Sequence, residues 1–337
     1  MTLPLHERFP GTKVLAHAAL ASLPTPVEPW TELARQLGFR SLFVKRDDLS
    51  GESYGGNKVR KLEFLLGQAL AEKRKSIVTF GARGSNHVRA TAVYGRRLGL
   101  KVHAVLTPQP STSYLEANLL ADRAAGATLH FVESQQEALA RGMELQIQLA
   151  RSDGIEPFVI PFGGTVPRGT IGFLNAAFEL ATQIERDEMP KPDVVYVPLG
   201  SMGTASGLAM GFAALGLSIQ VVGVRVVPAE IASLARARQI MKEALALLQE
   251  SDPGFPRLIP ENVGLHVREG FFGDGYAQPT AEAREAVALA TFHGLRLETT
   301  YTGKALAAVV ADARNNKLAD KTVLFWNTYN SRPMVRS

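Results

Sequence analysis

One lysine of this chain lies where an amine could act as a nucleophile. Lys58 follows Gly55, Gly56 and Asn57 at the predicted start of an amphipathic helix. A positive charge is disfavoured at a helix N-terminus, which lowers the pKa of an amine there, and a glycine pair lets a bulky group approach the backbone. An amine with a lowered pKa can form a Schiff base with a carbonyl compound. The local pattern alone is more typical of a solvated lysine on a helix face.

Charged residues surround this lysine in the sequence. Arg60 and Lys61 are predicted to lie on the outer face of the helix or to act as supporting cations near the site. The paired acids Asp47 and Asp48 suggest general acid/base chemistry, but they follow Lys45 and Arg46 directly. We therefore expect the two acids to form structural ion pairs.

A glycine-rich segment from Leu199 to Gly207 joins a predicted strand to a helix that begins near Ala205. Such a turn exposes backbone N–H groups beside a helix N-terminus, which is a ready anion site, and Thr204 could add a hydroxyl donor. The other interpretation is a tight turn that only packs helix on strand. A P-loop needs Gly-Lys-Ser/Thr, and a dinucleotide site needs G-x-G-x-x-G with a later acidic residue. Neither pattern occurs here, so a lone phosphate is favoured over ATP or NAD.

A second loop, Gly81 to His87, also lies between a predicted strand and a predicted helix. Ser85 and Asn86 either cap the helix or bind a carboxylate or a cofactor oxygen, and the local pattern does not decide between these roles. His87 by itself indicates little, because a lone histidine is more often structural.

Alternating strands and helices must position these loops. Strands are predicted at Ser41–Lys45, Ser76–Phe80, Lys101–Leu106, Leu129–Val132, Pro157–Ile160, Asp193–Pro198, Gln220–Val227 and Thr322–Trp326. Helices are predicted at Asn57–Glu72, His87–Leu98, Tyr114–Ala124, Gln135–Ala150, Ile171–Ile184, Ala281–His293 and Gly303–Asn315. This alternation predicts an α/β fold with parallel sheets and helices on both faces. The segment from Ser251 to Gly275 is rich in glycine and proline and is predicted to be a loop that borders a site.

The composition is that of an ordinary globular protein. The chain has 337 residues, of which 46% are hydrophobic and 20% charged, and its net charge is 37 − 32 = +5. The basic residues are scattered and form no block with aromatics, which argues against a nucleic-acid partner. There is no cysteine, so thiolate metal sites are excluded, and we expect no metal. No apolar run approaches the ~18 residues of a membrane span, and the N-terminus does not resemble a signal peptide. A cytoplasmic location is therefore the default expectation.

Several segments of the chain, taken together, form a longer pattern. They are Leu23-Pro24-Thr25-Pro26, Val44 to Leu49, Tyr54 to Phe64, Ser85-Asn86-His87-Val88-Arg89, Ile160 to Thr165, Gly200 to Gly207 and Tyr301-Thr302-Gly303-Lys304-Ala305. In this order, over nearly the whole chain, they resemble the pyridoxal-phosphate (PLP) enzymes of the D-cysteine desulfhydrase and 1-aminocyclopropane-1-carboxylate (ACC) deaminase family. That family is tryptophan-synthase-β-like, of fold type II.

The resemblance implies that PLP is the cofactor and assigns residues to it. Lys58 would bind PLP covalently and later move the substrate's α-proton. The ring would be held by Asn86 at its oxygen, by Tyr301 stacked nearby and by Thr328 at the pyridine nitrogen. The phosphate would be cradled by Gly200, Ser201, Met202, Gly203 and Thr204. A neutral hydroxyl at the ring nitrogen suits β-elimination better than transamination.

The resemblance also implies residues that meet the substrate. The substrate-binding residues would be Ser85, Asn86, His87, Gly164 and Tyr276, and Ser85, Tyr276 and Tyr301 would join Lys58 in catalysis. A large PLP-binding domain would comprise residues 1–53 and 161–337, and a small domain residues 54–160, each a mostly parallel twisted sheet flanked by helices. The cofactor would lie between the domains, and a homodimer is usual in the family.

Some positions depart from the family pattern. Thr302 follows Tyr301 where ACC deaminases typically have glutamate, which favours desulfhydrase-like chemistry. Arg83 in the serine-asparagine loop adds a cation, as does Arg168, and either could bind a second acidic group on the substrate or lie on the surface. Tyr329, after Thr328, is bulky where desulfhydrases usually have glycine, and it should reshape the pocket floor.

The favoured function is α,β-elimination from a small amino acid, giving a 2-oxo acid and ammonia, with ACC deamination as the close alternative. A non-catalytic relative that keeps PLP is an alternative of another class, against which the retained Lys58, Ser85, Asn86 and Tyr301 argue. A nucleotide-dependent oxidoreductase is a further alternative, and the missing dinucleotide fingerprint argues against it. Spacing alone does not supply the substrate, its stereochemistry or the leaving group.

Overall fold

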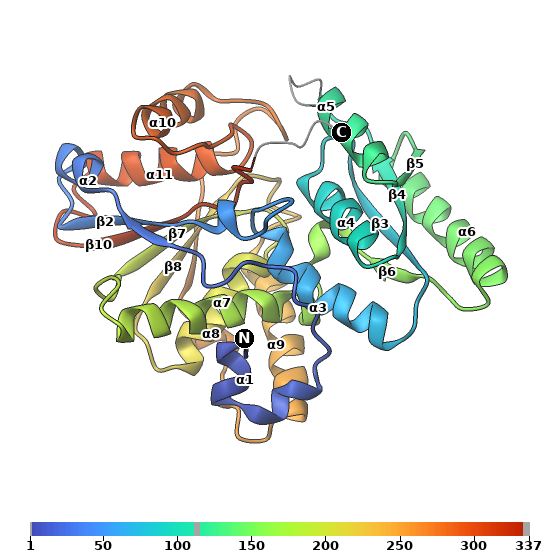
Figure 1. The fold of residues 1–337 in the computed structure, drawn as a ribbon. Helices are drawn as coiled ribbons and strands as arrows, with labels where there is room; N and C mark the ends of the chain where they lie inside the picture. Colours follow the sequence, from blue (N-terminus) through green and yellow to red (C-terminus); the bar gives the residue numbers. More distant parts are fainter. Residues whose placement is uncertain (1, 111–114, 333–337) are drawn as a thin grey trace.

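The computed structural model describes residues 2–110 and 115–332 and contains two sheets that lie next to each other (Figure 1). The six-stranded sheet has the order β1 (Val27–Pro29), β2 (Ser41–Lys45), β10 (Thr322–Trp326), β7 (Val194–Leu199), β8 (Gln220–Arg225) and β9 (Leu265–Arg268). Only the β1–β2 pair is antiparallel. The four-stranded sheet is parallel, with the order β5 (Thr128–Phe131), β4 (Lys101–Thr107), β3 (Ser76–Ala82) and β6 (Phe158–Ile160). The predicted α/β fold is confirmed.

Helices cover both faces of the larger sheet. One face packs against α7 (Pro167–Glu185), α8 (Gly203–Ala214) and α9 (Leu234–Ser251), and the other against α2 (Thr31–Leu37), α10 (Ala281–Phe292) and α11 (Thr302–Arg314). Helix α8 consists almost entirely of small and apolar residues, which is typical of a helix buried on all sides. A Cβ added to Gly207 would lie 2.5 Å from the Thr170 carbonyl oxygen, so this glycine allows α8 to pack closely on α7.

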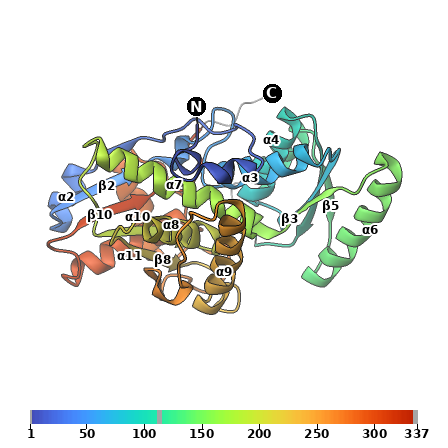
Figure 2. The same cartoon turned by 90° about the horizontal axis from the view of Figure 1, so that it is seen from below.

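The helix that carries the candidate lysine lies between the two sheets. Both views place α3 (Lys58–Ala71) between α7 and the smaller sheet (Figures 1 and 2). The smaller sheet also carries α4 (Asn86–Arg97), α5 (Leu115–Ala124) and α6 (Gln135–Asp153). A Cβ on Gly172 of α7 would lie 2.1 Å from the Arg60 carbonyl oxygen, so α3 and α7 touch backbone to backbone. Helix α3 is therefore covered on more faces than an amphipathic surface helix would be.

Every predicted strand is present within one or two residues of its expected bounds. The prediction that Ser251 to Gly275 is all loop was wrong, because β9 and a short 3-10 helix at Pro260–Asn262 lie within it. No element was predicted for α1 (Pro4–Arg8), a 3-10 helix at Pro10–Val14, β1, α2 or α9. The predicted start of a helix at Tyr114 lies outside the described residues, and the domain boundaries stay a prediction.

Across residues 2–110 and 115–332, no helix combines the length and the apolar character needed to cross a bilayer. Those residues likewise contain no group of acidic or histidine side chains that could hold a metal ion.

Candidate active site

The ends of three strands bring the candidate site together. Strands β7 and β10 are neighbours in the larger sheet, but α8, which follows β7, and α11, which precedes β10, pack on opposite faces of it. Ligands of open α/β sheets bind at such a reversal, outside the carboxyl ends of the strands. The loop after β7, the segment after β10 and the loop after β3 all contribute to the site described below.

The loop after β7 and the N-terminus of α8 form a concave backbone surface suited to an anion, which we call the cup. The loop comprises residues 200–202, and α8 begins at Gly203, two residues earlier than predicted. Met202 has a φ of 72°, which a non-glycine residue rarely adopts. A Cβ added to Gly203 would lie 2.9 Å from the Lys61 Nζ. The N-terminus of α8 therefore lies close to the Lys61 amine.

Lys61 is buried, so of its two predicted positions the one on the outer face of the helix was wrong. Its side chain has 0% exposure, and its ammonium donates to the Gly163 carbonyl at 3.1 Å and to the Thr165 hydroxyl at 3.0 Å. Burial, together with the charge of Lys58, lowers the pKa of Lys61 well below its ordinary value. The described residues give this ammonium only neutral acceptors. A buried cation is costly without an opposite charge, so the cup suits a bound anion.

Further hydroxyls line the same cup. Thr165 donates to the Ser201 hydroxyl at 2.7 Å, which connects the loop after β7 with the segment after β6. The Thr204 hydroxyl accepts a hydrogen bond from Asn57 Nδ2 at 3.0 Å. The lysine loop and the cup are therefore joined directly, through a residue that precedes Lys58.

The Lys58 loop is clamped between the ends of two strands. Gly56 N donates to the Asp47 carbonyl at 2.8 Å, and Asn57 N donates to the Thr328 carbonyl at 3.1 Å. Gly56 has a φ of 90°, and a Cβ there would lie 2.8 Å from the Thr328 oxygen. Glycine at this position is thus required by its backbone conformation and by the close approach of the segment after β10.

Lys58 itself is the first residue of α3 and is half-buried. Burial lowers the pKa of Lys58 to about 8. Its amine is therefore more often uncharged near neutral pH than that of an ordinary lysine, which favours its action as a nucleophile or a proton acceptor. The interpretation of Lys58 as a solvated surface lysine was wrong, because α3 lies inside the molecule.

The loop after β3 lies beside these two lysines. Ser85 caps α4 by accepting from Val88 N at 3.4 Å, which confirms the capping interpretation. His87 is buried and its Nε2 lies 3.1 Å from the Thr79 hydroxyl, while its Nδ1 has no partner among the described residues. Burial, and then the charges of Lys58 and Lys61, lower the pKa of His87 well below its ordinary value.

Gly164 and Asn86 complete this side of the site. A Cβ on Gly164 would lie 3.1 Å from the His87 Cε1, so the two residues are in contact. The Asn86 side chain accepts a hydrogen bond from the Tyr54 hydroxyl at 2.9 Å.

Two tyrosines close the opposite side. The Tyr276 and Tyr301 hydroxyl oxygens lie 2.5 Å apart, and a Cβ on Gly200 would lie 3.5 Å from the Tyr301 ring. The Glu298 carboxylate accepts from the backbone N–H groups of Tyr301 at 2.9 Å and Thr302 at 2.8 Å. Glu298 therefore fixes Tyr301 at the start of α11. Sequence reasoning missed this residue, whose only signal was an acid ahead of a helix start.

Arg83 and Arg168 were predicted either to bind a second acidic group on the substrate or to lie on the surface. Arg83 pairs with the exposed Glu133 at 3.1 Å and lies over the Phe131 ring. Arg168 is half-buried and has Glu72, at the far end of α3, as its charged neighbour. At 1.5 Å per residue, Glu72 lies about 20 Å along the helix from the candidate lysine. Any role of either arginine in binding the substrate stays a prediction.

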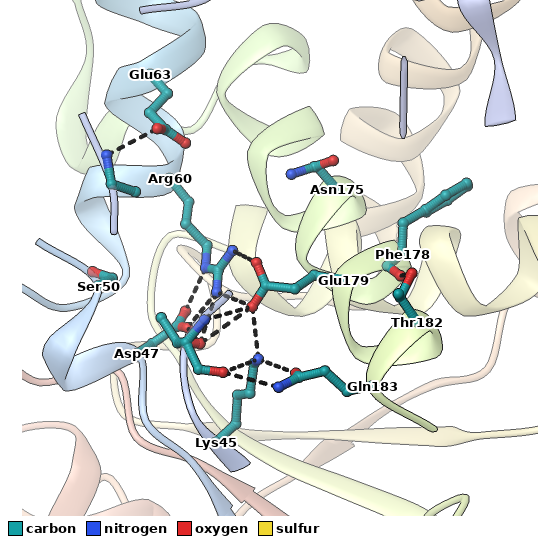
Figure 3. A network of polar contacts seen from close by, with 12 residues as sticks. Lys45, Asp47, Ser50, Arg60, Glu63, Asn175, Phe178, Glu179, Thr182 and Gln183 are labelled. Atoms are coloured by element: carbon teal, nitrogen blue, oxygen red, sulfur yellow. Dashed lines mark hydrogen bonds and ion pairs between the residues drawn. The ribbon is translucent and has the colours of Figure 1, made fainter. Parts of the chain in front are cut away.

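Behind the lysine loop lies a buried network of charges (Figure 3). The Arg60 guanidinium donates to Asp47 at 2.7 and 2.9 Å and to Glu179 at 2.9 and 3.0 Å. The Lys45 ammonium also donates to Glu179, at 2.6 Å. Arg60 is thus not on an outer face. The expectation that Asp47 and Asp48 form structural ion pairs is confirmed, with Arg60 and Arg46 as their partners.

The site as a whole can bind a ligand that carries both a phosphate and a carbonyl carbon. The cup after β7 and the Lys61 ammonium provide the donors for a phosphate. The amine of Lys58 provides a nucleophile for the carbonyl carbon. The structure also has an open hollow on α6, away from these loops. It lacks the strand ends and glycine-rich loops that form the candidate site, and it is lined by Glu144, Ile147, Gln148, Arg151 and Ser152.

The chain is similar to known proteins over nearly its whole length. Residues 19–328 match the family model described as pyridoxal-phosphate dependent enzyme. The chain is 33% identical over 334 residues to the D-cysteine desulfhydrase of Salmonella schwarzengrund (strain CVM19633), covering 97% of this chain and 96% of the relative. A solved ACC deaminase homologue has a TM-score of 0.83 at 31% identity, covering 98% of this chain and 95% of that one. The processed threonine deaminase isoform 2 from Solanum lycopersicum shares the fold, with a TM-score of 0.63 at 18% identity and coverage of 97% and 87%.

Proposed function

This chain belongs to the pyridoxal-phosphate dependent enzymes, and we propose that it catalyses α,β-elimination from a small amino acid, as D-cysteine desulfhydrases do. The cofactor is PLP, the fold is α/β of type II, and the class is that of the PLP-dependent lyases and deaminases. The products would be a 2-oxo acid, ammonia and the group released from the β-carbon. The observation that carries the proposal is the pair formed by the Lys58 amine and the anion cup that faces Lys61.

The residues present fit the cofactor. The buried Lys61 ammonium has only neutral partners among the described residues, and it lies close to Gly203 at the N-terminus of α8. Both features suit the PLP phosphate, which the loop 200–204 would hold by its backbone N–H groups. Lys58, with its pKa lowered to about 8, would hold the cofactor covalently.

When bound, PLP supplies an electron sink that stabilises negative charge at the substrate's α-carbon. The Lys58 Nζ would take the α-proton of the bound substrate. Its lowered pKa leaves it partly uncharged near neutral pH, as that role requires. The start of α4, with Ser85 and the unpartnered His87 Nδ1, would bind the substrate carboxylate. The Tyr276–Tyr301 hydroxyl pair would face the substrate from the other side and deliver or hold a proton there.

One residue favours elimination over ACC ring opening. Thr302 is fully buried, and its hydroxyl donates to Glu298 at 3.0 Å inside the start of α11. The position after Tyr301 therefore supplies no acid to the substrate, whereas ACC deaminases, as noted above, typically have glutamate there. Desulfhydrase-like chemistry needs no such acid, because the leaving group itself departs with the electron pair.

A substrate panel tests the proposal. We expect the purified enzyme with PLP to release pyruvate from D-cysteine or β-chloro-D-alanine, and the Lys58→Ala variant to release none. D-Serine, L-cysteate and ACC complete the panel, with 2-oxo acids separated by chromatography. Production of 2-oxobutyrate from ACC without pyruvate from D-cysteine would instead identify a deaminase. No product from any of the compounds would contradict both activities.

We likewise propose a homodimer in the cytoplasm, with a large domain of residues 1–53 and 161–337 and a small domain of residues 54–160. The family resemblance supports the dimer, and the separation of the two sheets supports the domain division. Light scattering in solution measures the mass of the assembly directly.

A further inference from the structure

The residue before the glycine pair, Tyr54, has no role in the function proposed above. Its ring is 7% exposed and packs in the core beneath the smaller sheet with Val59, Leu62 and Tyr94. Its hydroxyl donates to Asn86 Oδ1 at 2.9 Å, although the two residues are 32 positions apart in the chain. The lysine loop and the loop after β3 are therefore connected by a side-chain hydrogen bond at the site.

This hydrogen bond determines which end of the Asn86 amide faces the site. A side-chain amide has an oxygen that accepts and a nitrogen that donates, and the two ends are interchangeable in shape. The Tyr54 O–H has no other acceptor among the described residues, and burial raises its pKa, so it remains a donor. A buried hydroxyl requires an acceptor, so the oxygen of Asn86 must point toward Tyr54. The Asn86 Nδ2 is then directed away from Tyr54, and no described residue accepts from it.

We propose that Tyr54 is a positioning residue that locks the Asn86 amide with its Nδ2 toward the ring oxygen of PLP. The inference rests on the proposed function and on the role that the family resemblance implies for Asn86, a contact with that oxygen. A donor held in place stabilises negative charge on the ring oxygen, and the Tyr54 hydrogen bond also polarises the amide, which strengthens the donor. Without the hydroxyl, the amide is free to turn its oxygen toward the cofactor, where two acceptors would repel each other.

The test is a double-mutant cycle with Tyr54→Phe and Asn86→Ala. Two quantities are measured for each variant: the affinity of the apoprotein for PLP, and the pH at which the visible absorbance band of the bound cofactor titrates. Tyr54→Phe should weaken PLP binding roughly three- to tenfold, the range for one hydrogen bond. It should also move the band's titration to higher pH, because the ring oxygen loses a donor and binds a proton more tightly. In the Asn86→Ala background, Tyr54→Phe should change neither quantity, because its effect acts through the amide.

Tyr94→Phe is the matched control. The Tyr94 hydroxyl is also buried and donates to the Tyr54 carbonyl at 2.6 Å, but it does not contact Asn86. Both phenylalanine variants should lower the melting temperature of the apoprotein, while Tyr94→Phe should leave the titration of the band unchanged. A melting curve of apo Tyr54→Phe with a single transition shows that the variant is folded.

The outcomes separate this inference from the function on which it rests. An unchanged titration in Tyr54→Phe, or an equal shift with and without Asn86, would overturn the positioning role while Asn86→Ala still alters the band. If Asn86→Ala itself alters neither PLP binding nor the band, the assignment of Asn86 to the cofactor fails, and the role of Tyr54 fails with it. Release of pyruvate in the substrate panel would in that case still support the elimination activity.

Discussion

Two lysines one helical turn apart lie at the proposed cofactor site, and each has its own proposed role there. Lys58 and Lys61 lie at i and i+3 in α3, so their side chains lie on the same side of the helix. The charge of Lys58 contributes to the lowered pKa of Lys61. Two amines in one buried site repel each other when both are charged. A phosphate at Lys61 and a carbonyl carbon at Lys58 would relieve that repulsion together, which explains why the pair suits a ligand that carries both groups.

The role of Lys61 is tested by Lys61→Met, which keeps the volume and removes the charge. We expect PLP to bind about ten- to hundredfold more weakly, the range for one hydrogen bond to a charged group. Pyridoxal, which lacks the phosphate, should bind as it does to the unchanged protein. The apoprotein should melt at a higher temperature, because the variant removes a buried amine whose charged form the native state disfavours.

The control for Lys61→Met is Lys321→Met, which replaces an exposed lysine. It should alter neither cofactor affinity nor melting temperature. Equal losses of affinity for PLP and pyridoxal in Lys61→Met would show that Lys61 does not bind the phosphate.

At the scale of elements, α3 is held in place by buried ion pairs whose partners could not be predicted from the sequence pattern. Its residues Arg60 and Lys61 were predicted to be outer-face residues or supporting cations because a basic residue in an amphipathic helix usually faces water. Because α3 lies between α7 and the smaller sheet, Arg60 is buried. Its charge is neutralised there by the carboxylates of Asp47 and Glu179. Glu179 is 119 positions away in the chain, and no local period can indicate a partner at that distance.

The network predicts a dependence of stability on acid. Burial alone would raise the pKa of Glu179, but Arg60 and Lys45 outweigh it and lower the pKa to about 2, from an ordinary value of 4.5. A carboxylate whose pKa falls on folding stabilises the native state above its unfolded pKa. The contribution should be complete above about pH 4.5 and lost as the pH falls toward 2.

Urea unfolding of Glu179→Gln measures this contribution. At pH 7 we expect a loss of about 3 to 5 kcal/mol, the usual result of leaving buried partners unpaired, and a weaker change in stability between pH 4.5 and 2. Glu32→Gln removes an exposed ion pair with Arg35 and should leave the unfolding curve unchanged. An unfolding free energy for Glu179→Gln equal to that of the unchanged protein would show that the network does not stabilise α3.

At the scale of the whole molecule, the fold was largely predictable and the packing between its parts was not. Strands such as β7 and β10 are buried runs of branched and aromatic residues, which indicate parallel strands directly. Strand β9 was missed because it is a four-residue edge strand whose one buried side chain is Leu265. Residues 228–250 received no prediction, although α9 fills most of that segment.

In the candidate site too, the local elements were predictable from the sequence and the contacts between distant segments were not. The glycine loops and Lys58 were identified because each lies between elements that the pattern indicates, and the family motifs joined them. Local physics alone had favoured a surface position for Lys58, because nothing near it in the sequence reveals that α3 is covered on several faces. Tyr54, Glu298 and the position of Lys61 under the cup were missed for the same reason, since each depends on a contact between distant segments.

The central claim is that Lys58 holds the cofactor, and peptide mapping after borohydride reduction tests it most directly. Reduction fixes PLP on whichever amine binds it, and mass spectrometry of the digested protein then locates the added mass. We predict the modification on Lys58 and an unmodified Lys61. Modification of Lys61 instead, or a protein that carries no PLP on any lysine, would contradict the account.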